Sequence, residues 1–183
     1  MRIVRADVMS AKLMSTSKPT LAIQTDKWHA TTDQEQYAYA IFERQRPLYK
    51  IERTDKTKPI AFDAWILHDT NRVAMVETKC REMLYEEFVD RYGSKWLLSE
   101  SKLAKLSLCA RQYKRPAYGF LYFINCKKLL TLQLVSASGR IIERESKLVT
   151  SAEKYLGGVD TRQCALVQMR TATILQWHGR PVN

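Results

Sequence analysis

The stretch that decides the fold is IAFDAWILHDTNRVAMVETKC, residues 60–80. Two apolar runs, residues 60–67 and 73–80, flank a polar turn over residues 68–72. Runs of this kind are typical of strands that are covered on both faces. Strands covered on both faces occur in layered α/β domains. The stretch therefore predicts an antiparallel hairpin inside a central mixed β-sheet that is flanked by α-helices.

The segments on either side of the hairpin predict further helices and strands from their hydrophobic spacing and turn residues. The first helix is expected to begin near Thr31 and to stop before Pro47, because the residue that precedes a proline rarely stays helical. Beyond a loop at residues 136–139 the pattern weakens. The expected elements besides the hairpin are a helix over about 31–45, a strand over 48–52, helices over about 82–92 and 99–113, strands over 117–124 and 129–135, a short helix over 151–156 and a strand over 164–175.

The length of 183 residues and the apolar fraction of 45% predict a single globular domain with a real core. We expect an N-terminal arm or irregular segment over residues 1–30. The core is expected over residues 31–135. Residues 136–183 are expected to form a C-terminal extension that packs on the same domain.

The charge of the chain points to a polyanionic partner. Lys and Arg number 30 against 19 Asp and Glu, which gives a net charge of +11. Such an excess favours nucleic acid over an anionic membrane, since no strongly amphipathic basic helix is present. No apolar run is long enough to predict a membrane span. Four cysteines without zinc-site spacing, and no signal-peptide pattern at the N-terminus, predict a cytoplasmic, intracellular protein, and an origin in a virus or phage is compatible with this.

Charged residues interrupt the two apolar runs at Asp63, Glu77 and Lys79. If the turn centres on Thr70, residues whose numbers sum to 140 face each other, which pairs Trp65 with Met75, Leu67 with Val73, and Asp63 with Glu77. Side chains alternate along a strand, so all three charged groups are expected on one face of the sheet. Two opposed carboxylates repel each other unless a cation compensates them. A divalent cation such as Mg²⁺ or Mn²⁺ would do so, and Lys79 would reach the same place.

The Glu-x-Lys pattern alone is not specific, because it occurs three times, at residues 77–79, 100–102 and 145–147. The first copy differs from the others in its context. It lies at the end of an apolar strand, and Asp63 is in register with it on the neighbouring strand. Convergence of Asp, Glu and Lys on a metal is the minimum that metal-assisted phosphodiester hydrolysis requires.

With this order of elements and these residues, the stretch from about 32 to 135 resembles the PD-(D/E)XK nuclease superfamily. The resemblance implies a restriction-endonuclease-like core. It also implies that Asp63 and Glu77 hold the divalent metal, that the backbone carbonyl of Thr78 joins them, and that Lys79 assists the water nucleophile. A glutamate of the first helix often completes the site in the superfamily. Glu35 is the better match by position, with Glu43 as the alternative.

Two features are absent from this sequence. Phe62, not the proline of the superfamily motif, precedes Asp63, and the Gln-x-x-x-Tyr motif that some exonuclease branches carry does not follow. Basic residues further along the chain could bind nucleic acid, although a solvated surface explains them equally simply. The candidates are Lys102, Lys105, Arg111, Lys114 and Arg115.

These observations predict a divalent-metal-dependent deoxyribonuclease, an endonuclease with little sequence specificity or one directed by DNA structure. A Holliday junction resolvase, which would have to act as a homodimer because two strands must be cut, or an exonuclease of the same superfamily is the first alternative. The alternative of another class is a nonenzymatic nucleic-acid-binding protein that keeps the fold. Metal dependence separates these two classes.

Overall fold

A computed structural model of the chain describes residues 26–55, 60–152 and 159–176. The elements in chain order are α1 (Asp26–Gln45), β1 (Tyr49–Arg53), β2 (Ala64–His68), β3 (Asn71–Arg81), α2 (Tyr85–Tyr92), β4 (Lys95–Ser99), α3 (Glu100–Tyr113), β5 (Ala117–Phe123), the 3-10 turn η1 (Ile124–Cys126), β6 (Lys128–Val135), β7 (Glu145–Ala152), β8 (Val159–Gln168) and β9 (Thr173–Gln176).

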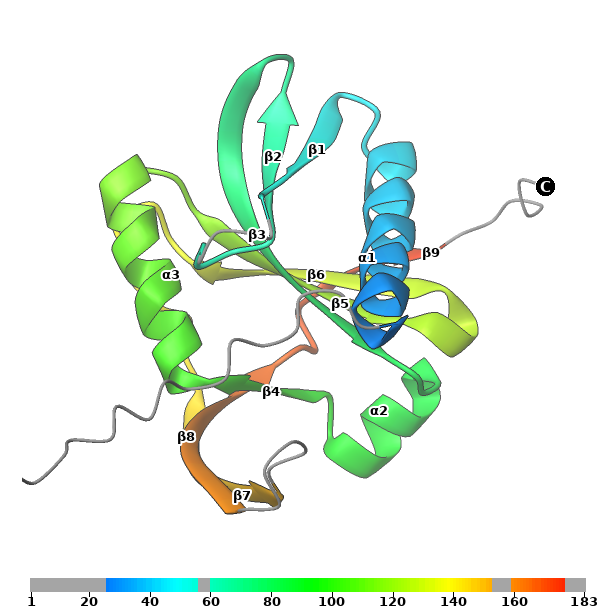
Figure 1. Cartoon of the computed structure of the whole chain (residues 1–183), viewed down its shortest axis with the longest axis vertical. Helices are drawn as coiled ribbons and strands as arrows, with labels where there is room; N and C mark the ends of the chain where they lie inside the picture. The colour runs from blue at the N-terminus through cyan, green and yellow to red at the C-terminus, as the bar shows by residue number, and fades with distance from the viewer. Residues whose placement is uncertain (1–25, 56–59, 153–158, 177–183) are drawn as a thin grey trace, which may run out of the picture.

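Six of the strands form a central mixed sheet in the order β1-β2-β3-β5-β6-β9. Strands β3 and β5 pair in parallel, and every other neighbouring pair of this sheet is antiparallel. Helices α1 and α3 lie on opposite sides of the sheet (Figure 1). The predicted fold class, a central mixed sheet flanked by helices, is confirmed.

Helix α1 covers one face of the sheet with a stripe of apolar residues at helical spacing. Ala38, Tyr39, Ile41 and Phe42 are all buried. The ring of Phe42 lies 5.0 Å from that of Phe120 in β5, measured between centroids. Even-numbered residues of β3 face this helix because side chains alternate along a strand.

Helix α3 covers the opposite face. Leu103, Leu106 and Ala110 recur at a spacing of three and four and are completely buried. They share a core with Met75 of β3 and Leu121 of β5, both odd-numbered. Full burial of each leucine contributes about 1.5–3 kcal/mol. The two faces of β3 therefore belong to two different cores.

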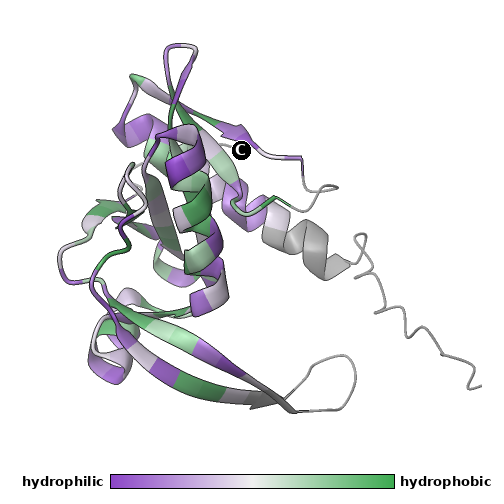
Figure 2. Ribbon diagram, turned by 90° about the vertical axis from the view of Figure 1, so that its left-hand side faces the viewer, coloured by the Kyte–Doolittle hydropathy of each residue, from purple (hydrophilic) through white to green (hydrophobic). Residues whose placement is uncertain are grey.

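A second, three-stranded sheet has the order β4-β8-β7 and packs into the core on the α3 side. Strand β4 leads directly into α3, and Ser99 caps the helix by accepting a hydrogen bond at Oγ from the Lys102 amide at 3.3 Å. The β7–β8 ribbon extends away from the six-stranded sheet (Figures 1 and 2). This arrangement brings the start of α3 and one end of β8 to the α3-side face of β3.

The hairpin confirms part of the predicted register. Trp65 lies opposite Met75 as expected. A bulge after Ile66 then shifts the pairing, so that Leu67 faces Arg72 and the predicted pair with Val73 is wrong. The cause is a tight turn in which Asp69 adopts a φ of 54°, which shortens the connection by one residue.

Other predicted bounds also need correction. Helix α1 begins at Asp26, inside the segment that was expected to be an arm, and β2 begins only at Ala64, after a bend over residues 61–63. The predicted strand over 164–175 is two strands, β8 and β9, that join different sheets. Of the predicted helix over 151–156, the first two residues belong to β7 and the rest lie outside the described residues. Strand β4 lies where no element was predicted, except that its last residue, Ser99, was expected to begin the next helix.

Among the described residues, no helix combines the length and the hydropathy that a membrane span requires.

Candidate active site

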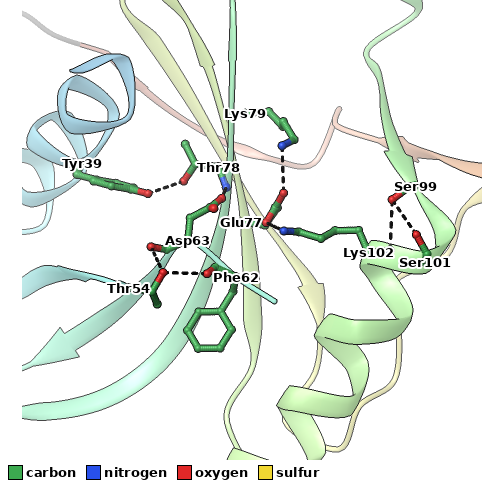
Figure 3. A network of polar contacts seen from close by, with 10 residues as sticks. All are labelled: Tyr39, Thr54, Phe62, Asp63, Glu77, Thr78, Lys79, Ser99, Ser101 and Lys102. Atoms are coloured by element: carbon green, nitrogen blue, oxygen red, sulfur yellow. Dashed lines mark hydrogen bonds and ion pairs between the residues drawn. The ribbon is translucent and has the colours of Figure 1, made fainter. Parts of the chain in front are cut away.

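Glu77 is a charged residue at the centre of the sheet. It lies on β3 opposite Gly119 of β5, and none of its surface is exposed. Its Oε2 is 2.7 Å from Nζ of Lys102, and its Oε1 is 3.3 Å from Nζ of Lys79 (Figure 3). Burial raises the pKa of Glu77, the charge of Asp63 raises it further, and the two lysines lower it. A buried carboxylate between two ammonium groups is thus held beside a second carboxylate.

The space around Glu77 depends on the residue that faces it. A Cβ at Gly119 would lie 2.3 Å from Cζ3 of Trp96, closer than any real contact. Trp96 is buried at 1% exposure and comes from β4, next to the start of α3. Glycine at 119 therefore lets the indole pack directly on β5, at the position that faces Glu77.

Asp63 lies in the bend just before β2, where its backbone is fixed by several bonds. Its amide donates to the carbonyl of Val76 at 2.8 Å, and its carbonyl accepts from the amide of Thr54 at 3.0 Å. Its Oδ2 accepts from the amide of Thr78 at 2.7 Å. The amide and carbonyl of one strand residue point toward the same neighbouring strand. The carbonyl of Thr78 is thereby directed to the side where Asp63 lies.

The side chain of Thr78 faces α1 and not the face that carries Glu77. Its Oγ1 is hydrogen-bonded to the hydroxyl of Tyr39 at 3.0 Å (Figure 3). Burial is the main reason that the pKa of Tyr39 is well above its ordinary value, so this hydroxyl stays neutral. The bond connects α1 to the part of β3 that holds Asp63 in place.

The two candidate glutamates of the first helix have different surroundings. Glu35 is buried on the α1 side, with Oε2 at 3.7 Å from Nη2 of Arg53. The charges of Glu35 and Asp63 both raise the pKa of Tyr39, which indicates that the two carboxylates lie near the same hydroxyl. Glu43 instead accepts a hydrogen bond at Oε1 from the amide of Ile51, in the middle of β1, at 2.7 Å.

Of the five residues expected to bind nucleic acid, Lys102 is the one that contacts Glu77. Lys105 is exposed one turn further along α3. Lys114 lies about 18 Å from Lys102 along the helix axis at 1.5 Å per residue. Nε of Arg115 donates to the carbonyl of Arg72 at 2.8 Å, at the same far end where Arg111 is also found. The structure therefore does not bring these three residues to Glu77.

Two arginines that sequence reasoning missed line the same cleft as Glu77. Arg81 continues the alternation of Glu77 and Lys79 along β3, a signal that could have found it. Arg162 comes from β8, and no local pattern pointed to it, because β8 reaches the site by pairing with β4. The cleft has a volume of about 420 Å³ and also includes Lys102.

The residues present are compatible with a hard divalent cation. Within the described ranges no group of three or more His, Cys, Asp or Glu side chains could hold a metal ion. Mg²⁺, however, is usually held by one or two carboxylates together with waters and phosphate oxygens. Asp63, Glu77 and the carbonyl of Thr78 supply such a set. Apart from the two lysines, neither oxygen of Glu77 has a hydrogen-bond partner in the part of the chain that is described.

No protein-family model and no curated protein matches this chain. Among solved structures it is similar to a Holliday junction resolvase from the archaeal hyperthermophile Archaeoglobus fulgidus. The identity is 20%, the alignment covers 51% of this chain and 72% of that chain, and the TM-score is 0.36. Similarity at this level carries no functional conclusion, so the function has to be inferred from the site itself.

Proposed function

We propose that this protein is a divalent-metal-dependent nuclease that hydrolyses phosphodiester bonds in DNA. The observation that carries the proposal is the buried carboxylate of Glu77, held at 2.7 Å from Lys102 and 3.3 Å from Lys79 and in the electrostatic range of Asp63. A buried carboxylate is costly unless it is compensated, so a site of this kind is a candidate for function.

Asp63, Glu77 and the carbonyl of Thr78 would hold the metal. A bound Mg²⁺ or Mn²⁺ would polarise the phosphate and lower the pKa of a water molecule. Asp63 is oriented for this role by the hydrogen bond from the Thr78 amide at 2.7 Å. Glu35, on the α1 side of Asp63, is the further carboxylate that could bind a water or a second cation there.

Lys79 is the residue that we infer to act on the reacting groups. Its side chain is 46% exposed, while the carboxylate that it contacts is fully buried. The ammonium group therefore lies between Glu77 and the solvent, where it can donate hydrogen bonds to the attacking water or to a phosphate oxygen. Lys102, 26% exposed, holds the second oxygen of Glu77 and adds positive charge to the same cleft.

The net charge of +11 supplies affinity for the phosphate backbone that does not depend on sequence. We infer an endonuclease with little sequence specificity, or one directed by the structure of the DNA. An exonuclease is the alternative, and it would require a free end. Circular substrates therefore separate the two activities.

The test is a cleavage assay on linear, circular and branched DNA with Mg²⁺, Mn²⁺ or EDTA. We expect metal-dependent cleavage by the wild type and its loss in Lys79→Ala. Lys50→Ala, which removes an exposed lysine of β1, is the control and should cut normally. Absence of cleavage of every DNA and RNA substrate by a folded wild type that still binds nucleic acid would refute the nuclease.

A nonenzymatic DNA-binding protein is the second candidate. It is favoured by one observation, that lysine ammonium groups contact both oxygens of Glu77 where a metal would bind. In such a protein Glu77→Ala would keep its affinity for DNA, or gain affinity as negative charge is lost. In the nuclease, the same variant would lose metal-dependent cleavage.

A further inference from the structure

The described residues that line the cleft beside Glu77 include more cationic than anionic side chains. Four cationic side chains line it against one carboxylate. Two of them, Lys79 and Lys102, are ion-paired with Glu77. The polar and charged residues of the lining are Glu77, Lys79, Arg81, Ser99, Lys102 and Arg162. The other two cationic side chains of this lining are Arg81 and Arg162.

Arg81 extends from the last residue of β3 into this cleft. Its guanidinium has no hydrogen-bond or ion-pair partner among the described residues, and its side chain is exposed. Because side chains alternate, Arg81 follows Glu77 and Lys79 on the same face of the strand. A line of charges along one strand thus leads from the buried carboxylate to the mouth of the cleft.

Arg162 reaches the cleft from the other sheet. Ser99 pairs with Cys164 where β4 and β8 run side by side, and β4 ends there as the chain turns into α3. Arg162 lies two residues before Cys164 in β8 and on the same face, and it lines the cleft together with Ser99 and Lys102 at the start of α3. Both Cys164 and Arg162 line the cleft.

The first turn of α3 adds a partial positive charge at this place. The helix has 14 residues and begins directly after its N-cap, Ser99. The backbone amides of its first turn point out of this end of the helix. The one acidic residue of that turn, Glu100, is bound by Arg144 at 3.0 Å and by Ser146 at 2.8 Å. Its charge is thereby compensated from outside the cleft.

We propose that Arg81 and Arg162, with the start of α3, form a phosphate-binding subsite next to the Asp63/Glu77 centre. Guanidinium groups match the geometry of phosphate oxygens and bind them through two parallel hydrogen bonds. The ligand is a phosphate of the nucleic acid other than the one that is cut, either inside a continuous strand or at a strand end. The inference deepens the proposed function and rests on it.

The test measures DNA binding in EDTA by wild type, Arg81→Ala, Arg162→Ala and the double variant, with Lys50→Ala as the control that matches each single variant in charge. We expect each arginine variant to bind about tenfold more weakly, the loss of one charge-assisted contact. Each phosphate contact contributes about 0.9 to the slope of log K against log salt for duplex DNA, so the double variant should lower that slope by about 2. The DNA affinity of Arg162→Lys should lie between those of wild type and Arg162→Ala, since lysine keeps the charge and loses the bidentate geometry.

Three DNA substrates distinguish the two sources of phosphate: a circle, a linear duplex with 5′-phosphates and the same duplex with 5′-hydroxyls. A loss of affinity in the arginine variants that is equal on all three substrates identifies an internal phosphodiester as the ligand. A loss of affinity that occurs only with the 5′-phosphorylated duplex identifies a terminal phosphate as the ligand. Both results support the subsite, and the second also favours an exonuclease.

Binding constants and salt slopes of the double variant that equal those of Lys50→Ala would overturn the subsite. Failure of the subsite and failure of the nuclease give different results. If the wild type cuts DNA and the double variant binds normally, the subsite is wrong and the nuclease stands. If the arginine variants lose DNA binding but no metal supports cleavage by the wild type, the nuclease is wrong and the subsite stands. Both arginines are exposed, so thermal unfolding is expected to confirm that all variants fold.

Discussion

Replacing Lys102 with methionine tests the energetics of the buried Glu77 carboxylate. The change removes the ammonium group at 2.7 Å from Oε2 and keeps an unbranched apolar chain of similar length. Removing one partner of a fully buried ion pair costs about 3–5 kcal/mol. Two facts reduce this cost here: Lys79 still contacts Oε1 at 3.3 Å, and the side chain of Lys102 is 26% exposed. We therefore expect a loss of about 2 kcal/mol in the free energy of unfolding.

The loss should depend on pH in a definite direction. The pKa of Glu77 is already raised by burial, and loss of Lys102 raises it further. Only the ionised form of Glu77 is stabilised by the ammonium group of Lys102. The destabilisation is therefore present above the pKa of Glu77 and disappears as the pH falls below it. For a domain of this size, about 2 kcal/mol corresponds to a decrease of about 4–8 °C in Tm at pH 8.

Thermal and urea unfolding of wild type and Lys102→Met at several pH values would measure this. Lys105→Met on the exposed part of the same helix is the matched stability control. A double-mutant cycle with Glu77→Gln isolates the pair, because Lys102→Met should cost almost nothing once the charge at 77 is gone. An equal cost in both backgrounds, or a loss that does not change with pH, would refute the reasoning.

Three further outcomes follow from the same geometry. Saturation with Mg²⁺ at about 100 times its Kd should raise the unfolding free energy of the wild type by about 2.7 kcal/mol and leave Glu77→Gln unchanged, which calorimetry would measure; equal shifts in both would argue against a metal at this carboxylate. Tyr39→Phe should cost about 1 kcal/mol in urea unfolding through loss of the 3.0 Å bond to Thr78, and a neutral result would mean that this bond does not hold α1 to β3. Gly119→Ala should cost about 1–3 kcal/mol because its Cβ would meet Trp96 at 2.3 Å, and a stable variant with an unshifted indole fluorescence would contradict the packing.

Local sequence patterns predicted the central hairpin and the common face of Glu77 and Lys79. Alternation along β3 is a local property, and so is the register that pairs Trp65 with Met75. The turn was less predictable, because one residue in a left-handed conformation, Asp69, shifted the pairing of Leu67. Periodicity specifies which face a residue occupies, but it does not specify how tightly the chain turns.

The remainder of the site depends on contacts between distant parts of the chain. The spacing of α3 predicts which residues are buried but not that its first turn lies over β3, where Lys102 meets Glu77. Arg162 reaches the cleft only because β8 pairs with β4. The bond from the Thr78 amide to Asp63 also depends on the bend before β2 and has no sequence pattern of its own.

The most direct test of the central claim is the rate at which Asp63→Asn nicks circular DNA in Mg²⁺, compared with wild type and Lys50→Ala. Asparagine keeps the shape of the side chain and an oxygen that can accept the Thr78 amide, but it removes the charge that a metal requires. The account predicts that Asp63→Asn folds normally and loses at least about 100-fold in rate, while Lys50→Ala cuts as the wild type does. Nicking by Asp63→Asn at the wild-type rate would contradict a metal-dependent centre at Asp63 and Glu77.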